Sequence, residues 1–262
     1  PYCACDPTCA PGQCGMADGC GGTCGCGDNQ ICQAGQCLCE VLPDCTNKAC
    51  GDDGCGGSCG VCMGPETCLA LGTGSYCVLA PSPGDVVVTE IRANTPTPCD
   101  GVDWFEVLNF TGSDISLKNC VIGDDSATGE HTIDEAAIVP AGGYAVLASD
   151  SLGDVDVAYF FSKPNLNKTS DSIYLRCPDE AGIMNQLFWM HYGADVPNPG
   201  DGASVGYCPN LGPAAPDAMD YLTAEHWALS TAGAYGCGAD IGSPGLANPA
   251  CDVDCEPTCA AP

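Results

Sequence analysis

Cysteine is the residue that most constrains how this chain can fold. Seventeen of the 25 cysteines lie in residues 1–77, and the other eight are scattered through residues 78–262. Between Cys3 and Ser75 the sequence contains no Phe, Tyr or Trp and few aliphatic side chains. Such a segment cannot bury enough apolar surface to offset its chain entropy. We therefore expect disulfides to hold it together.

The cysteines of this segment form an internal repeat. The cores of the two copies read CGMADGCGGTCGC and CGDDGCGGSCGVC. Eight cysteines per copy allow four disulfides in 105 connectivities, among which the sequence does not choose. The first copy covers 1–38, with Cys5, Cys9, Cys14, Cys20, Cys24, Cys26, Cys32 and Cys37, and the second covers 39–78, with Cys39, Cys45, Cys50, Cys55, Cys59, Cys62, Cys68 and Cys77.

A third cysteine-rich element begins in residues 250–262, where CEPTCAAP echoes the CDPTCAPG of residues 5–12. Because the total of 25 cysteines is odd, at least one is unpaired or bonded to another chain. The candidates for bonds between subunits are those outside the complete repeats and the second half, namely Cys3, Cys251, Cys255 and Cys259.

Charge and composition exclude several classes of partner. The chain has 34 acidic and 6 basic residues, a net charge of −28, which repels nucleic acid and anionic lipid surfaces. No apolar run approaches the roughly 20 residues of a membrane helix, so we expect no membrane insertion. The cysteine density predicts an oxidising compartment. Since the chain begins at Pro1 without a Met or a signal peptide, we expect a processed protein that is extracellular or on a cell surface.

After a Pro-containing linker at 79–84, the pattern changes to short strands separated by Gly/Pro turns. This pattern predicts an all-β fold, an antiparallel sandwich or barrel. The segment 217–229 comes nearest to helical periodicity and is expected to form at most a short helical turn. The expected strands are 85–93, 103–110, 114–122, 143–149, 157–161, 171–177, 185–190 and, more weakly, 204–208.

Residues 85–249 resemble a lamin-tail domain, an immunoglobulin-like β-sandwich also found in secreted bacterial proteins. The motifs that carry the resemblance are TEIRAN at 89–94, WFEVLN at 104–109, the strand at 114–122, PAGGYAVL at 140–147, SDSIYL at 170–175 and GSPGLANP at 242–249. Cys120 stands where the family usually has Trp. We hypothesise that a disulfide, with Cys99 as the candidate partner, replaces that tryptophan as the pin of the sandwich.

The resemblance implies a non-enzymatic interaction or scaffold module, because lamin-tail domains act in that way. Some nuclear relatives have been linked to DNA, but residues 78–262 carry only five basic residues against 26 acidic ones. The cysteine repeats are similar to repeats in secreted proteins of myxobacteria and their relatives, to which no activity is assigned. Fold alone does not assign a function.

The sequence offers no catalytic motif and no cofactor-binding motif. Acidic residues around His131, and a second group at 149–157, are the kind of ligands that Ca²⁺ prefers, but a solvated acidic turn is the favoured explanation of both. The group at 149–157 lacks the spacing of an EF-hand loop. His191 and His226 lie beside aromatic residues and are expected to pack at strand ends. Disulfides, not zinc, explain the cysteines, since only Cys59 and Cys62 have the paired spacing of zinc ligands.

Sugar binding by the repeats is disfavoured, because residues 3–75 have no aromatic side chain on which a sugar ring could stack. In the second half, Trp104 and Trp189 are both expected in the core. Pro-flanked hydroxyls make Ser82, Thr95 and Thr97 candidates for O-linked glycosylation.

These observations predict an exported structural protein that is not an enzyme. Its expected partners are other copies of itself, in an extracellular fibre, sheath or surface layer, because contacts that do not close give open filaments. A glycan or cell-wall ligand is a further expected partner. The alternative is a monomeric adhesion or binding module cut from a larger surface protein, and a third possibility is an accessory domain of a secreted hydrolase.

Overall fold

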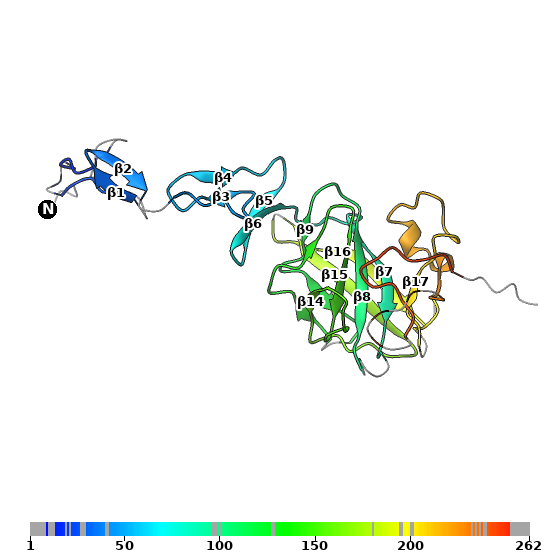
Figure 1. The fold of residues 1–262 in the computed structure, drawn as a ribbon. Helices are drawn as coiled ribbons and strands as arrows, with labels where there is room; N and C mark the ends of the chain where they lie inside the picture. The colour runs from blue at the N-terminus through cyan, green and yellow to red at the C-terminus, as the bar shows by residue number, and fades with distance from the viewer. Residues whose placement is uncertain are drawn as a thin grey trace, which may run out of the picture. The chain divides into compact units, whose positions relative to one another are not determined.

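The structure is a computed structural model (Figure 1). Contacts divide the chain into two compact units, Pro1–Val78 and Leu79–Pro262. The residues described are 9, 14–18, 20, 22–26, 30–39, 42–95, 99, 101–126, 129–179, 181–193, 196–199, 202–231, 233, 235, 237 and 240–251.

The first unit is built from short antiparallel hairpins. Its described buried residues of hydrophobic type are Val78 and four cysteines, Cys14, Cys24, Cys50 and Cys55. Cross-links therefore take the place of a hydrophobic core, as the composition predicts. The hairpins pair β1 (Gln30–Gln33) with β2 (Gln36–Cys39), β3 (Gly51–Asp52) with β4 (Ser58–Gly60), and β5 (Thr67–Leu71) with β6 (Gly74–Val78).

The second unit is a β-sandwich of two main sheets, which confirms the predicted all-β class. The six-stranded sheet has the order β14 (Val157–Phe160), β13 (Tyr144–Ala148), β8 (Trp104–Asn109), β7 (Val86–Arg92), β17 (Val205–Tyr207) and β18 (Trp227–Leu229). The four-stranded sheet has the order β11 (His131–Thr132), β10 (Val121–Gly123), β15 (Asp171–Pro178) and β16 (Met184–Tyr192). A small ladder joins β9 (Ile115–Ser116) to β12 (Ile138–Val139).

Side chains of both sheets meet in one core. Val107 and Leu147 from the six-stranded sheet belong to the same buried cluster as Leu175 and Phe188 from the four-stranded sheet. Every residue of the central strands β7 and β8 is buried, including the polar ones. Strands buried on both faces leave charged side chains no access to water, so their partners decide what they can do.

The expected strands are found with small differences. The segment 114–122 divides into β9 and the start of β10, separated by a turn in which Asn119 has a positive φ. The segment 217–229 holds two 3₁₀ turns, η1 (Asp220–Leu222) and η2 (Ala224–His226), followed by β18. The expected linker at 79–84 is not free, because the Leu79 amide donates to Asp114 O and Leu79 O accepts from Ser116 N.

Candidate functional site

The disulfides of the first unit follow one scheme in both copies. When the eight cysteines of each copy are numbered along the chain, the second bonds the fifth, the third the seventh and the sixth the eighth. Cys20 is also disulfide-bonded, and Cys5 lies outside the described residues. The bonds are Cys9–Cys24, Cys14–Cys32 and Cys26–Cys37 in the first copy, and Cys45–Cys59, Cys50–Cys68, Cys62–Cys77 and additionally Cys39–Cys55 in the second.

An aspartate shapes the same turn in each copy. Asp18 Oδ1 accepts from the amides of Cys20 and Gly22, and Asp53 Oδ1 accepts from those of Cys55 and Gly57. A Cβ at Gly22 or Gly57 would approach the aspartate carboxylate to 2.5 or 2.3 Å, so a larger residue there would displace the aspartate from these hydrogen bonds. The repeated DGCGG sequence is therefore a turn that presents a cysteine for cross-linking.

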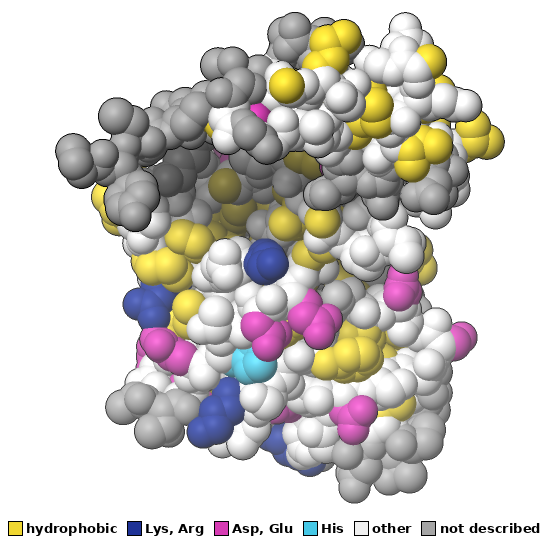
Figure 2. All heavy atoms as spheres, turned by 90° about the vertical axis from the view of Figure 1, so that its left-hand side faces the viewer, with side chains coloured by type: hydrophobic (Ala, Val, Ile, Leu, Met, Phe, Trp, Pro, Cys, Tyr) yellow, Lys and Arg dark blue, Asp and Glu magenta, His cyan; other side chains and the backbone are white. Residues whose placement is uncertain are grey.

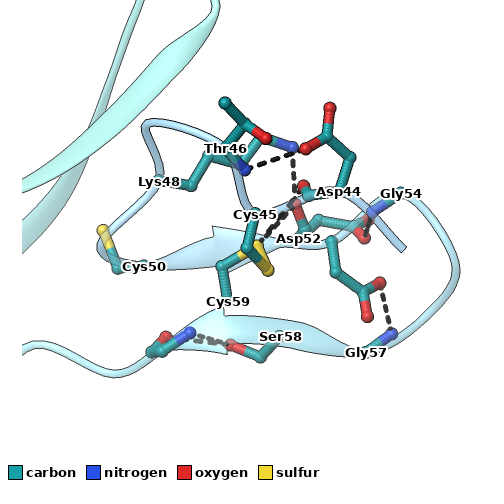
Figure 3. Close-up of a disulfide and its surroundings, with 12 residues drawn as sticks. Asp44, Cys45, Thr46, Lys48, Cys50, Asp52, Gly54, Gly57, Ser58 and Cys59 are labelled. Carbon is teal, nitrogen blue, oxygen red and sulfur yellow. Dashed lines mark hydrogen bonds between the residues drawn. A yellow bond between two sulfur atoms is a disulfide. The ribbon is translucent and has the colours of Figure 1, made fainter. Parts of the chain in front are cut away.

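Around the Cys45–Cys59 disulfide, aspartate side chains again accept hydrogen bonds from nearby backbone amides (Figure 3). Asp44 Oδ1 accepts from the Thr46 amide at 2.8 Å, and hydrogen bonds from Thr46 lower the pKa of the Asp44 carboxyl. Asp52 Oδ1 accepts from the Gly54 amide at 2.7 Å. These side chains satisfy backbone donors locally and act as parts of the turns.

Cysteine sulfurs gather at two places where the geometry alone would suit a metal. The groups are Cys14, Cys26 and Cys37 in the first copy, and Cys50, Cys62 and Cys68 in the second. All six are disulfide-bonded. A bonded sulfur cannot become the thiolate that ligates zinc.

Three disulfides join described residues of the second unit, and they correct two expectations. Cys120, which directly precedes β10, bonds Cys177 of the neighbouring strand β15 and does not bond Cys99. Cys99 instead bonds Cys237, 138 residues further along the chain. The proposed pin between sheets is thus a bond within one sheet.

Cys251 also departs from its expected role. It is 8% exposed and bonds Cys208, so it is not available for a bond between subunits. Cys3, Cys255 and Cys259 lie outside the described residues, and their pairing between subunits stays a prediction.

Two buried glutamates fasten the segment 242–248 to the sandwich. Glu90 and Glu106 are directly opposite one another on β7 and β8, and both are 0% exposed. Glu90 accepts from the backbone amide and hydroxyl of Ser243, and Glu106 Oε2 accepts from the Gly245 amide at 2.7 Å. Asn248 Nδ2 donates to the Thr89 carbonyl at 2.8 Å. The glutamates of the TEIRAN and WFEVLN motifs are therefore structural anchors.

Burial shifts the protonation of this pair. Desolvation raises the pKa of Glu90, and desolvation followed by repulsion from Glu90 raises the pKa of Glu106 to about 9. Both carboxyls face hydroxyl and amide groups of the same cluster. At neutral pH Glu106 is consequently a neutral acid, because two like charges this deeply buried are unfavourable.

A buried ion pair joins Arg92, which is on β7 like Glu90, to Asp240. The Arg92 Nε donates to Asp240 Oδ2 at 3.0 Å, and the two side chains are 1% and 0% exposed. The Tyr235 hydroxyl donates to the same carboxylate and accepts from Trp104 Nε1 at 3.1 Å. This network connects β7 and β8 to the chain around residue 240 and confirms that Trp104 is a core residue.

His131 closes the side of the sandwich where two edge strands meet. Its Nε2 lies 2.8 Å from the Tyr159 hydroxyl and its Nδ1 3.0 Å from Ser162 Oγ. The Tyr159 hydroxyl in turn donates to Asp134 Oδ1 at 2.8 Å. With its proton on Nε2, His131 donates to the Tyr159 hydroxyl and accepts at Nδ1 from the Ser162 hydroxyl. These hydrogen bonds link β11 to β14. The arrangement holds two strands together, and its histidine faces a phenol instead of a carboxylate.

The acidic residues near His131 have separate partners. Asp124 Oδ1 accepts from the Ser126 amide, Asp125 Oδ1 accepts from Trp189 Nε1, and Glu130 Oε1 accepts from the Tyr174 hydroxyl. In the group at 149–157, Asp150 accepts from the amide that follows it. Binding of Ca²⁺ at either place stays a prediction.

Trp189 is not a core residue, in contrast to the expectation. Its side chain is 42% exposed, whereas Phe188 and Met190 on either side of it are 2% and 5% exposed. Its ring stacks with that of His191, with centroids 6.2 Å apart. His226 packs as expected, edge-on to Tyr207.

The proposed glycosylation sites differ in accessibility. Ser82 is exposed, so modification there stays a prediction. Thr95 is 1% exposed and its hydroxyl donates to the Cys99 carbonyl, which leaves no room for a sugar in the folded protein. Thr97 lies outside the described residues.

The described residues drawn in Figure 2 form no strong basic patch on that face. On the face drawn in Figure 2, basic side chains lie singly among acidic and apolar ones. Among the described residues, no helix is long and apolar enough to cross a membrane.

The sheets, their shared core and the anchored closing segment define an immunoglobulin-like β-sandwich whose site residues are structural. Residues 80–190 match the family model of the Lamin Tail Domain. This match confirms the resemblance over that range, and the fold of this family is non-catalytic. The segment 242–249 lies beyond the matched residues. No curated protein matches the chain significantly.

Proposed function

We propose that this is an exported, non-enzymatic structural protein that associates with copies of itself in an extracellular fibre, sheath or surface layer. The observation that carries the proposal is the edge strand β16. It is the longest described strand, Met184–Tyr192, and its sequence MNQLFWMHY contains no charged residue and no proline. In the part of the chain that the structure describes, only β15 pairs with it along its length.

An edge of this kind favours pairing with another chain. Unpaired N–H and C=O groups on an edge strand are a template for strand addition, and proteins usually blunt such edges with charge, proline or short length. The other described edges are shorter: β11 has two residues, β18 three and β14 four. The long uncharged edge is therefore the place where two copies would pair.

The charge of the chain sets the conditions for assembly. A net charge of −28 opposes association of like subunits, so the contact must be locally uncharged and aided by salt or divalent cations. The disulfides of both units support a location outside the cytosol, where such bonds persist. An extracellular structural role agrees with both properties.

Negative-stain microscopy of the purified chain, with and without reductant, tests the proposal. We expect regular filaments or sheets, and we expect them to be lost in Gln186→Asp, which places a charge at an exposed position of β16. Thr132→Asp, at an exposed position on the opposite edge of the same sheet, is the matched control and should still assemble. Assemblies that survive reductant would place the contacts in strand pairing, whereas collapse would place a disulfide between subunits.

Dispersed single particles of one chain, in all salt conditions, would contradict self-association. That result would favour the alternative, a monomeric adhesion or binding module of a larger surface protein. The exposed Trp189 is the observation in favour of the alternative, because an aromatic ring left in solvent is a common element of binding surfaces.

A further inference from the structure

The outward face of the four-stranded sheet carries an ordered pair of aromatic rings. In the register of the sheet, Tyr174 of β15 lies opposite Gly123 of β10 on one side and Trp189 of β16 on the other. The alternate residues Ile173 and Phe188 are buried in the core. Because side chains alternate along a strand, Tyr174 and Trp189 project from the other face of the sheet. They belong to β15 and β16, which lie side by side in Figure 1.

Tyr174 is fixed against the sheet. A Cβ at Gly123 would lie 2.3 Å from its Cζ and hydroxyl oxygen, so the ring occupies the space that the missing side chain leaves. Its hydroxyl donates to Glu130 Oε1 at 2.6 Å, and the Arg176 guanidinium carbon lies 4.7 Å from the ring centroid. The ring is thus held by contacts on its edge and by a cation over it.

Trp189 is held as firmly, although 42% of it is exposed. Its ring lies within 12° of the plane of the His191 ring, and its Nε1 donates to Asp125 Oδ1 at 3.4 Å. A ligand that covers an exposed tryptophan removes apolar surface from water, which favours binding. One that is already oriented by a hydrogen bond loses little further entropy when a ligand binds.

The chemistry of the face defines its ligand. The exposed ring of Trp189 can receive the apolar C–H face of a sugar ring, with Tyr174 beside it, and the adjoining carboxylates of Asp125 and Glu130 can accept hydrogen bonds from sugar hydroxyls. The charge of −28 repels anionic polymers, nucleic acids included, but not neutral or cationic ones. We propose that this face, defined by Tyr174, Trp189, His191, Asp125 and Glu130, binds a polysaccharide of neutral or amino sugars.

This site does not depend on self-association. Strand pairing would use the backbone at the edge of β16, whereas sugar stacking uses side chains on the face of the sheet. Filaments in micrographs together with no sugar binding in solution would contradict this inference and leave the proposed function standing. Sugar binding by a chain that stays as single particles would support this inference and contradict self-association.

Tryptophan fluorescence offers a direct measurement, because Trp104 and Trp227 are 0% and 3% exposed and Trp189 is the exposed tryptophan. We would titrate the full chain with hexamers of N-acetylglucosamine (neutral), glucosamine (cationic) and galacturonate (anionic). We expect saturable changes with the neutral or the cationic hexamer, and none with the anionic one.

Variants separate stacking from charge. Affinity, measured by calorimetry, should fall about tenfold or more in Trp189→Ala. It should stay unchanged in Phe160→Ala, which removes a 54%-exposed ring from the other sheet. The inference is overturned if the neutral and cationic hexamers both fail to bind at millimolar concentration. It is also overturned if Trp189→Ala, checked for folding by near-UV circular dichroism, binds as tightly as the unaltered chain.

Discussion

Two glutamates on the central strands β7 and β8 are among the most buried residues that the structure describes. Glu90 and Glu106 each have a raised pKa because burial removes their carboxyls from water, and hydrogen bonds from hydroxyl and amide groups offset this effect only in part. The consequence at the residue scale is that folding retains a proton. A group whose pKa is higher in the folded state stabilises the fold below its unfolded pKa and loses that effect as the pH rises through the folded value.

For Glu106 the window runs from its ordinary value of 4.5 to about 9. Glu106→Gln removes the titrating group and keeps a hydrogen-bonding side chain. We expect the free energy of unfolding of the unaltered protein to fall by up to ~1.4 kcal/mol per pH unit within this window from Glu106 alone. This contribution to the pH dependence of the unfolding free energy should be absent in the variant. Urea denaturation at several pH values would measure the difference. The exposed Glu135→Gln is the control, and equal slopes in all three proteins would contradict the assignment.

The buried ion pair gives a second residue-scale prediction. Asp240→Asn leaves the Arg92 guanidinium, 1% exposed, without its counter-charge. Removing one partner of a buried pair typically costs ~3–5 kcal/mol. The matched control is Glu130→Gln, which breaks the Arg176–Glu130 pair at side chains 37% and 52% exposed and should cost less than ~1 kcal/mol. Chemical denaturation compares the two, and losses of similar size would contradict this ranking.

At the scale of elements, the second unit gives a prediction for the Cys120–Cys177 bond between β10 and β15. It closes 57 residues of chain, and a closure of that length restricts the unfolded state by ~4 kcal/mol. We expect the double variant Cys120→Ala, Cys177→Ala to lower the free energy of unfolding by about that amount. Thermal unfolding followed by circular dichroism would measure the loss, and an unchanged midpoint would show that the strand pairing alone is sufficient.

Alternating polarity predicted most strands of the sandwich but not which face of a strand is buried. The segment around Trp189 explains why. A bulge between Leu175 and Arg176 changes the register with β16, so Leu187 and Phe188 are both buried and Trp189 turns outward. Bulges have no reliable mark in a single sequence. Short strands such as β11 and β12 were missed because two residues carry no periodicity.

The candidate site residues were predictable only where the partner is near in the chain. The DGCGG turns of the repeats, with their aspartates and glycines, follow from local spacing. The anchoring role of Glu90 does not, since Ser243 lies 153 residues further along. The pairing of Cys99 with Cys237 has the same cause, because contacts at such separation depend on the complete fold.

At the scale of the whole molecule, the two units are stabilised by different means. We therefore expect reduction of the disulfides to unfold the first unit before the second. The described buried hydrophobic-type residues of the first unit are mostly cysteines, whereas the second unit has a continuous core from two sheets. Without its disulfides the first unit cannot offset its chain entropy. The sandwich keeps its core and loses only the contribution of its cross-links.

Limited proteolysis with mass spectrometry, before and after reduction and alkylation under native conditions, tests this difference. We expect the oxidised chain to resist cleavage throughout both units. After mild reduction, cleavage sites should open within residues 1–78 first, while a fragment that starts near Leu79 persists. The cysteines of the second unit that are 0% exposed, namely Cys120, Cys177, Cys208 and Cys237, should be alkylated last. Simultaneous loss of both units would mean that the disulfides, and not the apolar core, hold the sandwich together.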